Sequence, residues 1–441
     1  MANPSELPPN ITQTESRYHR NRSVAFIKDK ANRLNYSNLL NLAKERLRRR
    51  AFSEAEQFFT QALSLKVDSV DSLFGRAQCR WATGKREAAI SDLVAALDLD
   101  NANEAVFKEL VSALLETEQE YRALEVCNSV LGRHPTNVTA LIGRDWVLSI
   151  IAPLWHVPMT NERERNQAYL DGLKIGDIGG ADLVFEIGTG TGLLSMMAAR
   201  LGAKAVVTCE AKRTVAGIAN EVVKKNGLGD VITVLPKMSN QVVLGTDLHR
   251  KADVLIHEIF SSELLSEGVL PAIEDAKARL LKPDAKIIPG RAAAMVALVG
   301  GEAVGNHVHV GKSFGFDLSE FNKTQPTKVP LYREDLKPEF LSGDLEAFEF
   351  DFQRDSEFPA KSLVHTITAT KDGLCYGLIQ WIKLDFGAGL VFENHPLDPK
   401  ETSNWQHLVY KFKEPVSVQK GDQIIIRALH DRSRLWFDLL K

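Results

Sequence analysis

The sequence predicts a chain of three structured parts: α-helical repeats, an α/β domain with a doubly wound parallel sheet, and an antiparallel β domain. Small residues recur every 34 positions in residues 36–146. Apolar strands alternate with helical stretches in residues 147–289, and strands of alternating polarity separated by turn residues fill residues 290–441. Apolar strands that alternate with helical stretches are typical of an α/β sheet, and segments of alternating polarity are typical of antiparallel strands. Residues 1–35 are polar with early prolines, and we expect a loosely held leader there.

The composition is that of an ordinary globular protein with several domains. Its 441 residues exceed one domain, and 44% are hydrophobic and 25% charged. A formal net charge of −3 gives no general attraction to nucleic acid or to an anionic membrane, so neither is an expected partner. We expect no secretory signal, and there is no apolar run of about 18 residues. Four widely spaced cysteines without a CxxC pair indicate no disulfide framework and no metal site, so we expect a cytoplasmic protein.

Three series of residues in the first part repeat with a step of 34 residues. We expect them where the two helices of a repeat cross closely, because that crossing requires small or apolar side chains. The period resembles the tetratricopeptide repeat, in which each unit is a pair of antiparallel helices. Such an array commonly holds an extended peptide, but it can also be a scaffold that only packs against its neighbour. The series are Ala55, Ala89 and Ala123; Ala62, Ala96 and Val130; and Phe59, Leu93 and Cys127.

A glycine-rich turn follows the first predicted strand of the α/β domain. The sequence VFEIGTGTG places Gly188, Gly190 and Gly192 between an apolar strand and a helix. Backbone can approach a ligand closely there, and the helix offers free N–H groups. Glu210 closes the next strand, 24 positions after Glu186, and can accept hydrogen bonds from ribose hydroxyls. These features predict a nucleoside cofactor, although the spacing is GxGxG and not the dinucleotide fingerprint GxGxxG.

Two glutamates, Glu258 and Glu267, lie nine residues apart in the loop after a later apolar strand, ADVLIH. A guanidinium group is planar, permanently charged and offers a fork of donors, so two carboxylates match it well. Such a pair can localise charge away from the attacking nitrogen and hold that nitrogen in line with a methyl donor. The alternative is a solvated acidic loop, which is how we interpret the neighbouring Glu263 and Glu274.

Taken together, these motifs resemble the protein arginine N-methyltransferases, a family of class I S-adenosylmethionine-dependent methyltransferases. The glycine turn resembles their motif I, and Glu258 and Glu267 fall on the two glutamates of their acceptor loop. IGTGTGLLSMMA and EGVLP look most like the branch that makes monomethyl or symmetric products. The resemblance covers roughly residues 150–441. It implies a Rossmann-like domain, a C-terminal β-barrel and methyl transfer from S-adenosylmethionine to arginine in a protein or peptide.

The resemblance also assigns residues to the cofactor. Besides Gly188, Gly190, Gly192 and Glu186, it places Arg165 on the cofactor carboxylate and Glu210 on the ribose. It places Met238 beside the adenine ring. No residue is assigned to a metal.

Further residues are expected at the reaction centre. The resemblance places Met159 there, and Trp405 falls on the tryptophan of the family's Thr-His-Trp loop. The chain departs from the family where Asn404 replaces the histidine of that loop and Glu162 replaces its aspartate partner. An amide can donate to a carboxylate but cannot share a proton as an imidazole does.

Two other functions remain open at this point. The chain could be a repeat scaffold that binds cofactor without turnover, and Asn404 supports that alternative. It could also methylate a small molecule, although helical repeats argue against an acceptor that needs no extended groove. Relatives with such repeats usually carry two catalytic modules where this chain has one, so a homodimer could supply the second.

Overall fold

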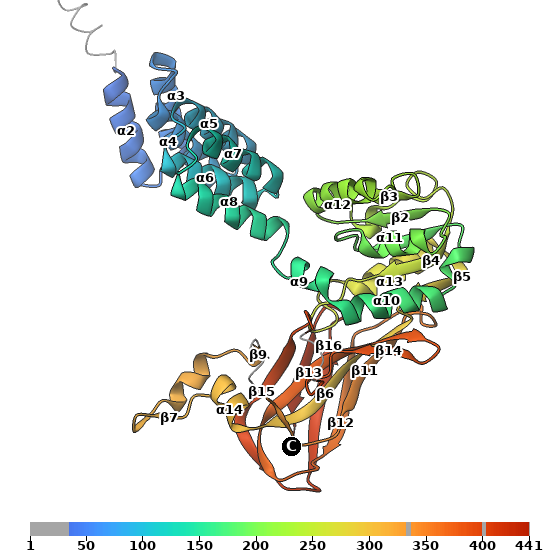
Figure 1. Cartoon of the computed structure of the whole chain (residues 1–441). Helices are drawn as coiled ribbons and strands as arrows, with labels where there is room; N and C mark the ends of the chain where they lie inside the picture. The colour runs from blue at the N-terminus through green and yellow to red at the C-terminus, as the bar shows by residue number, and fades with distance from the viewer. Residues whose placement is uncertain (1–34, 332–336, 399–402, 441) are drawn as a thin grey trace, which may run out of the picture. The chain divides into compact units, whose positions relative to one another are not determined.

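The computed structural model describes residues 35–331, 337–398 and 403–440 (Figure 1). Apart from its last residue, the predicted leader lies outside these ranges. The described chain forms two compact units, which divide between Ile151 and Ala152. The predicted division after Trp146 falls inside a helix that continues to Ile151. Within the described ranges, no helix combines the length and apolar character needed to cross a membrane.

The first unit is built from helices whose starting points repeat along the chain. Capping residues with a step of 34, Asn35, Ser69, Asn103 and Asn137, precede every first helix of a pair. The side-chain oxygen of each accepts the backbone N–H three residues later, which satisfies a free donor of the first turn. The helices are α2 (Tyr36–Arg48), α3 (Phe52–Leu65), α4 (Val70–Ala82), α5 (Arg86–Leu99), α6 (Glu104–Glu116), α7 (Glu120–Arg133) and α8 (Val138–Ile151).

The residues that recur every 34 positions are buried where these helices pack. Ala55, Ala89 and Ala123 have no exposed surface. On α4, a Cβ at Gly75 would lie 2.2 Å from Cζ of Phe59 on α3, so only glycine fits beside that ring. The prediction of an α-helical first part is confirmed.

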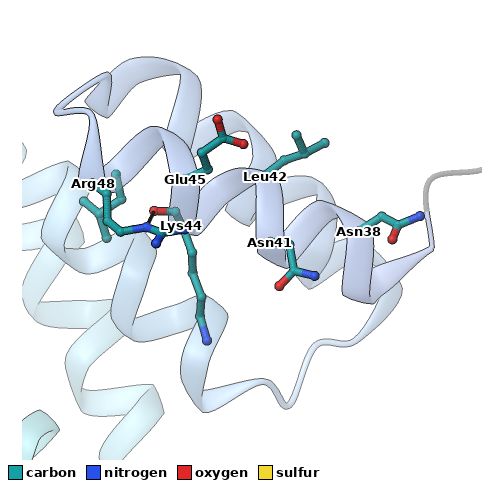
Figure 2. Close-up of a pocket in the computed structure, with 7 residues that line it drawn as sticks. Asn38, Asn41, Leu42, Lys44, Glu45 and Arg48 are labelled. Atoms are coloured by element: carbon teal, nitrogen blue, oxygen red, sulfur yellow. Dashed lines mark hydrogen bonds between the residues drawn. The ribbon is translucent and has the colours of Figure 1, made fainter.

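A surface pocket of this unit runs along one face of α2 (Figure 2). Its lining comes from that single helix, from polar and charged residues together with two leucines. It contains none of the residues predicted to bind cofactor or acceptor, so it is not the predicted active site. The labelled lining residues are Asn38, Asn41, Leu42, Lys44, Glu45 and Arg48.

The second unit begins with a five-stranded parallel sheet in the order β3-β2-β1-β4-β5. The chain runs outward from β1 to β3 and then returns to place β4 on the other side of β1. Ligands of open α/β sheets bind at the carboxyl ends of strands where the order reverses in this way. The predicted doubly wound parallel sheet is confirmed. Its strands are β1 (Val184–Ile187), β2 (Val206–Cys209), β3 (Ile232–Leu235), β4 (Ala252–His257) and β5 (Leu281–Ile288), with helices α9 (His156–Asn161), α10 (Arg163–Ile175), α11 (Leu193–Arg200), α12 (Arg213–Lys225) and α13 (Val269–Arg279).

Antiparallel strands follow, as the alternating pattern predicted. The larger sheet has the order β10-β6-β13-β15-β9, with β11 on β6 and β14 on β13, and a smaller sheet has the order β12-β16-β17. The larger sheet contains β6 (Arg291–Gly300), β9 (Lys328–Leu331), β10 (Glu339–Phe340), β11 (Leu345–Asp351), β13 (Gly373–Gly387), β14 (Leu390–Glu393) and β15 (His407–Val418). The remaining elements are β12 (Lys361–Thr368), β16 (Gln423–His430), β17 (Leu435–Leu439), α14 (Glu302–Val308), the hairpin β7 (Lys312–Ser313) and β8 (Phe316–Asp317), and the 3₁₀ helix η3 (Ser319–Thr324).

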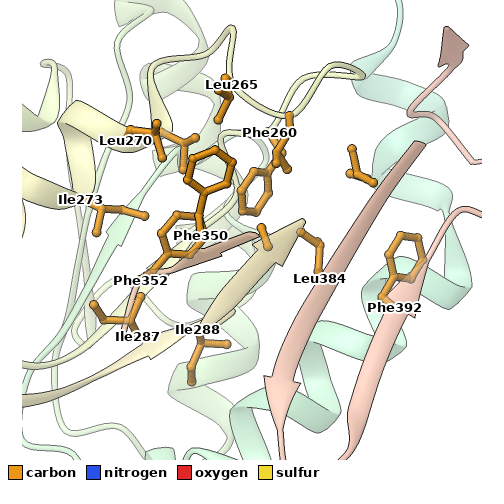
Figure 3. Packing of buried hydrophobic residues seen from close by; sticks show 14 of the residues in the cluster. Phe260, Leu265, Leu270, Ile273, Ile287, Ile288, Phe350, Phe352, Leu384 and Phe392 are labelled. Atoms are coloured by element: carbon orange, nitrogen blue, oxygen red, sulfur yellow. The ribbon is translucent and has the colours of Figure 1, made fainter. Parts of the chain in front are cut away.

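One hydrophobic core joins the parallel sheet to the antiparallel strands (Figure 3). Phe260 and Leu265, from the loop that follows β4, belong to this core. The ring of Phe260 lies 6.2 Å from that of Phe352, which directly follows β11. Because apolar side chains of the loop are buried in this way, its backbone is held in place by the core beneath it.

Candidate active site

The glycine turn after β1 packs directly against the start of the loop that carries the paired glutamates. Gly188 has φ of +92°, and a Cβ there would lie 2.9 Å from the carbonyl oxygen of Glu258. At Gly190, with φ of +51°, nothing would lie within 4 Å of a Cβ. The backbone N–H of Gly190 donates to Oε2 of Glu210 at 3.1 Å. The turn therefore has one face closed against the β4 loop and an open face beside Glu210.

Glu186 is the third residue of β1 and lies two residues before Gly188. It has no exposed surface, and its carboxylate accepts a hydrogen bond from the hydroxyl of Ser195 on α11. Burial raises the pKa of Glu186 to about 7, although hydrogen bonds from Ser195 and Thr208 oppose the rise. In this position it ties β1 to α11 and presents no surface to a ligand. The sequence had placed it in contact with the cofactor.

Arg165 and Glu258, assigned to different ligands by sequence, form a buried ion pair. Nη2 of Arg165 on α10 lies 2.5 Å from Oε2 of Glu258, with 4% and 8% of the side chains exposed. The guanidinium lies 5.3 Å from the ring of Tyr169 and 5.8 Å from the ring of Trp405. The Tyr169 hydroxyl donates to the carbonyl of His257 at 3.1 Å, which ties α10 to the end of β4. The residue predicted to hold the cofactor carboxylate is thus the ion-pair partner of the first glutamate predicted to bind the acceptor.

Glu267 is the carboxylate of the site whose charge is least compensated. Its side chain reaches solvent, yet desolvation by the surrounding protein raises the pKa of Glu267 to about 7. The charges of Glu258 and Glu210 raise it further, so the three carboxylates lie within electrostatic range of one another. In the described parts of the chain, Glu267 has no ion pair or side-chain hydrogen bond. The arrangement favours a bound cation at Glu267.

The segment of residues 403–406, which directly precedes β15, contacts the loop that carries Glu258 and Glu267. The indole N–H of Trp405 donates to the carbonyl of Phe260 at 2.7 Å. Glu162, between α9 and α10, accepts the Asn404 backbone N–H at 2.9 Å and the Ser403 hydroxyl at 3.0 Å. Burial raises the pKa of Glu162 despite these two hydrogen bonds. The donors to Glu162 are therefore a backbone amide and a serine, and the side-chain amide expected of Asn404 is not one of them.

The two predicted methionines lie in different environments. Met159 is nearly buried on α9, three residues before Glu162. Met238 is half exposed at the entry to a short 3₁₀ helix after β3. Met238 is accessible to a ligand, whereas Met159 is packed against the surrounding protein.

Glu263 and Glu274 correct a prediction from the sequence, because neither is a solvated loop residue. Glu263 is buried and lies 2.5 Å from Nζ of Lys328 on β9. Glu274 accepts the backbone N–H of Phe358 at 2.6 Å and pairs with Arg432. Both connect the α/β part to the antiparallel strands. Within the ranges the structure covers, no group of three or more His, Cys, Asp or Glu could hold a metal ion.

Comparison with known proteins identifies related sequences. Residues 170–289 match the family model described as Ribosomal protein L11 methyltransferase (PrmA). An arginine N(omega)-methyltransferase from Streptomyces achromogenes subsp. streptozoticus is 36% identical over 325 residues, which are 72% of this chain and 88% of that protein. Protein arginine N-methyltransferase 7 is 29% identical in Drosophila yakuba and in Rattus norvegicus, over 64% and 66% of this chain. The chain spans about half the length of those two relatives, 47% and 46%.

Two solved structures share the fold. One is a chain of the Trypanosoma brucei PRMT1 enzyme-prozyme heterotetrameric complex with AdoHcy, with a TM-score of 0.55 and 24% identity over 64% of this chain and 92% of that one. The other is Arabidopsis thaliana protein arginine methyltransferase 10, with a TM-score of 0.53 and 20% identity over 64% and 88%. These identities establish the fold alone. The relative that is 36% identical over 88% of its own length establishes more: this chain belongs to the arginine N-methyltransferase family.

Proposed function

We propose that this S-adenosylmethionine-dependent arginine methyltransferase acts on arginine side chains of a protein or peptide, with Glu258 and Glu267 as the acceptor-binding pair. One observation carries the assignment of the site. The glycine turn packs against the backbone of Glu258, and the charge of Glu258 contributes to the raised pKa of Glu267. Both carboxylates therefore gather where the order of the parallel strands reverses, beside the turn expected to hold the cofactor.

The residues around the glycine turn fit S-adenosylmethionine. The open face at Gly190 leaves space for a ligand against the backbone, and Glu210 lies next to it. We assign Glu210 to the ribose, Arg165 to the carboxylate and the exposed Met238 to the adenine ring. Glu186 supports the turn from behind. When bound, the cofactor supplies an electrophilic methyl group on a sulfonium centre.

The side chains of the site then position the acceptor. Glu258, held by Arg165, and Glu267, which lacks an ion pair among the described residues, accept hydrogen bonds from the guanidinium. The bound cofactor would supply its methyl group to one guanidine nitrogen, and that nitrogen would lose a proton. Glu267 accepts this proton, because a carboxylate with a pKa of about 7 can both take a proton and release it to water near neutral pH.

The helical unit supports a protein or peptide acceptor. Its residues 87–125 include ten acidic and two basic side chains; apart from Asp92, which is buried and paired with Arg76 and Arg80, this excess of acids complements an arginine-rich segment. Exposed apolar side chains, including Tyr121, Ile142 and Trp146, offer further contacts. A second candidate is free arginine, because the relative from Streptomyces achromogenes subsp. streptozoticus is named an arginine N(omega)-methyltransferase without reference to protein.

Labelled cofactor distinguishes these acceptors. We expect mass spectrometry to find methyl groups on arginine-rich peptides after incubation with the full chain. Methylation of free arginine with no methylation of peptide would replace the proposed acceptor. Cofactor binding without any methylated product, seen in a parallel titration, would favour the non-catalytic scaffold.

Finer features of the architecture belong to the same proposal. We assign the helix pairs to tetratricopeptide-type repeats, which the 34-residue step of capping residues and buried alanines supports. We assign the two antiparallel sheets to one β-barrel, supported by the hydrophobic core that they share. A cytoplasmic location agrees with four free, buried cysteines, and imaging of a tagged chain would test it.

A homodimer is proposed from an exposed apolar segment after α14. Phe314 is fully exposed, and Phe316, Leu318 and Phe321 are 71%, 44% and 57% exposed. A contiguous set of this kind is typical of a protein–protein contact. Light scattering should report twice the mass of the chain, and Phe314→Ser with Phe316→Ser should return the mass to that of a monomer. An unchanged mass would exclude this segment as the dimer contact.

We predict a pH dependence from Glu267. Because its pKa is raised to about 7 and guanidinium binding needs the ionised form, kcat/KM for the acceptor should fall about tenfold per pH unit below about pH 7 and level off above it. Initial rates from about pH 5.5 to about pH 9 measure this. Glu186 has a pKa in the same range, so the variant Glu186→Gln is the control, and its kcat/KM should still fall below about pH 7. If kcat/KM no longer fell at low pH in that variant, the pH dependence would belong to Glu186 and not to Glu267.

A further inference from the structure

Glu263 lies midway between the two glutamates of the acceptor loop, the segment from Glu258 to Glu267. Only 9% of its side chain is exposed, and its Oε2 lies 2.5 Å from Nζ of Lys328, the first residue of β9. Tyr410, on β15, pairs with Lys328 across the sheet. Burial raises the pKa of Tyr410 and the charge of Glu263 raises it further, which places the carboxylate beside this strand pair as well. The centre of the loop is thus anchored to the antiparallel sheet.

The balance of charges in the acceptor loop indicates the function of the Glu263–Lys328 ion pair. Three carboxylates within ten residues repel one another unless cations compensate them. Arg165 compensates Glu258, and Lys328 compensates Glu263. In the described residues, Glu267 has no such cation. The chain therefore supplies its own cations to the first and second glutamates, and the third is left for a ligand.

We propose that Lys328 is a positioning residue for the acceptor, whose ion pair with Glu263 fixes the middle of the acceptor loop and so sets the separation of Glu258 from Glu267. This inference rests on the proposed function, in which those two glutamates hold the guanidinium. A buried carboxylate that loses its partner is costly to keep buried, so without Lys328 the centre of the loop would move toward water. Trp405 and Gln406 would still hydrogen-bond to Phe260 and Ser262, but these two contacts would hold only part of the loop in place.

Lys328→Met tests the proposal because it keeps the length and apolar stem of the side chain and removes the charge. We expect kcat/KM for an arginine-rich peptide to fall about 10- to 100-fold, in line with a small misplacement of catalytic groups. The dissociation constant for S-adenosylmethionine, measured by titration, should change by less than about twofold, because Lys328 does not touch the glycine turn. Lys328→Arg keeps the charge and should recover most of the activity.

Lys383→Met is the matched control. Lys383 also lies on the antiparallel sheet, with 33% of its side chain exposed against 29% for Lys328, and it pairs with Glu346. That carboxylate is 38% exposed, so losing its partner leaves no buried charge. The control variant should keep wild-type kinetics. If it lost as much activity as Lys328→Met, general weakening of the sheet would explain both.

Amide hydrogen exchange provides a readout that does not need turnover. In Lys328→Met, residues 258–267 should exchange about tenfold faster or more, while β1 and β2 keep wild-type protection. Glu263→Gln combined with Lys328→Met should be no worse than the more damaged single variant, because both changes break one interaction. Unchanged exchange in the loop, or defects that multiply in the double variant, would overturn the proposal. A wild-type chain that methylates no arginine would instead overturn the proposed function, and the exchange result would still decide whether Lys328 holds the loop.

Discussion

Replacing either Glu258 or Glu267 with glutamine is expected to lower kcat for arginine methylation by about 100- to 1000-fold. Glutamine keeps the shape of the side chain but loses the charge that orients the guanidinium and, at Glu267, the group that accepts its proton. S-adenosylmethionine should still bind, because Gly190 and Glu210 are unchanged. Turnover assays and cofactor titration on the same samples measure both quantities. Glu221→Gln, which removes an exposed carboxylate from α12, should have no effect.

The two variants should differ in stability. Glu258→Gln leaves Arg165 buried without its charge partner, and breaking a buried pair from one side costs about 3–5 kcal/mol. Glu267→Gln breaks no ion pair among the described residues and removes a carboxylate whose ionisation the protein disfavours. Thermal unfolding should therefore show a lower Tm for Glu258→Gln and an equal or higher Tm for Glu267→Gln. Full activity in both variants, or equal losses of Tm, would contradict the roles assigned here.

Gly188→Ala is expected to reduce both stability and activity strongly. Its φ of +92° is unfavourable for any residue with a Cβ, and the added atom would lie 2.9 Å from the carbonyl of Glu258 and from Cγ2 of Ile259. The backbone strain alone costs about 1–2 kcal/mol, and relief of the clash would displace Glu258. We expect a loss of Tm together with a fall of about 100-fold or more in kcat/KM.

Gly190→Ala distinguishes the effect of backbone strain from the effect of filling the space assigned to the cofactor. Its φ of +51° lies in the left-handed region, and nothing in the structure would lie within 4 Å of the new Cβ. The variant should lose only the strain energy of about 1–2 kcal/mol, with no added clash. It should nevertheless bind S-adenosylmethionine more weakly, because the Cβ projects into the space assigned to the cofactor. If Gly188→Ala kept a wild-type Tm while Gly190→Ala lost stability, the geometry of the turn would be wrong.

Features that repeat or cluster along the chain could be predicted from the sequence. The 34-residue step located the helix pairs, because the small residues at close crossings recur with the structure itself. The glycine turn and Glu210 could be placed at one edge of the parallel sheet, since both directly follow apolar strands. Glu258 and Glu267 could be paired because one short loop carries both.

Contacts between distant segments could not be predicted in this way. Lys328 lies 65 residues from Glu263, and Ser403 lies 241 residues from Glu162. No periodicity relates such residues, so Glu263 had the same appearance as a solvated acid. Glu186 shows a different limit: the sequence could place an acidic residue before the glycine turn, but not its complete burial or its hydrogen bond with Ser195. The boundary expected after Trp146 lies within α8, whose helical continuation to Ile151 no break in the sequence pattern signals.

The way in which the acceptor loop is held has a practical consequence for enzyme engineering. Its ten residues depend on α10 through Arg165, on the 403–406 segment through Trp405, and on β9 through Lys328. Transplanting only those ten residues into another methyltransferase would transfer the carboxylates without the groups that aim them. A chimera that inherits acceptor choice would have to carry all four segments together.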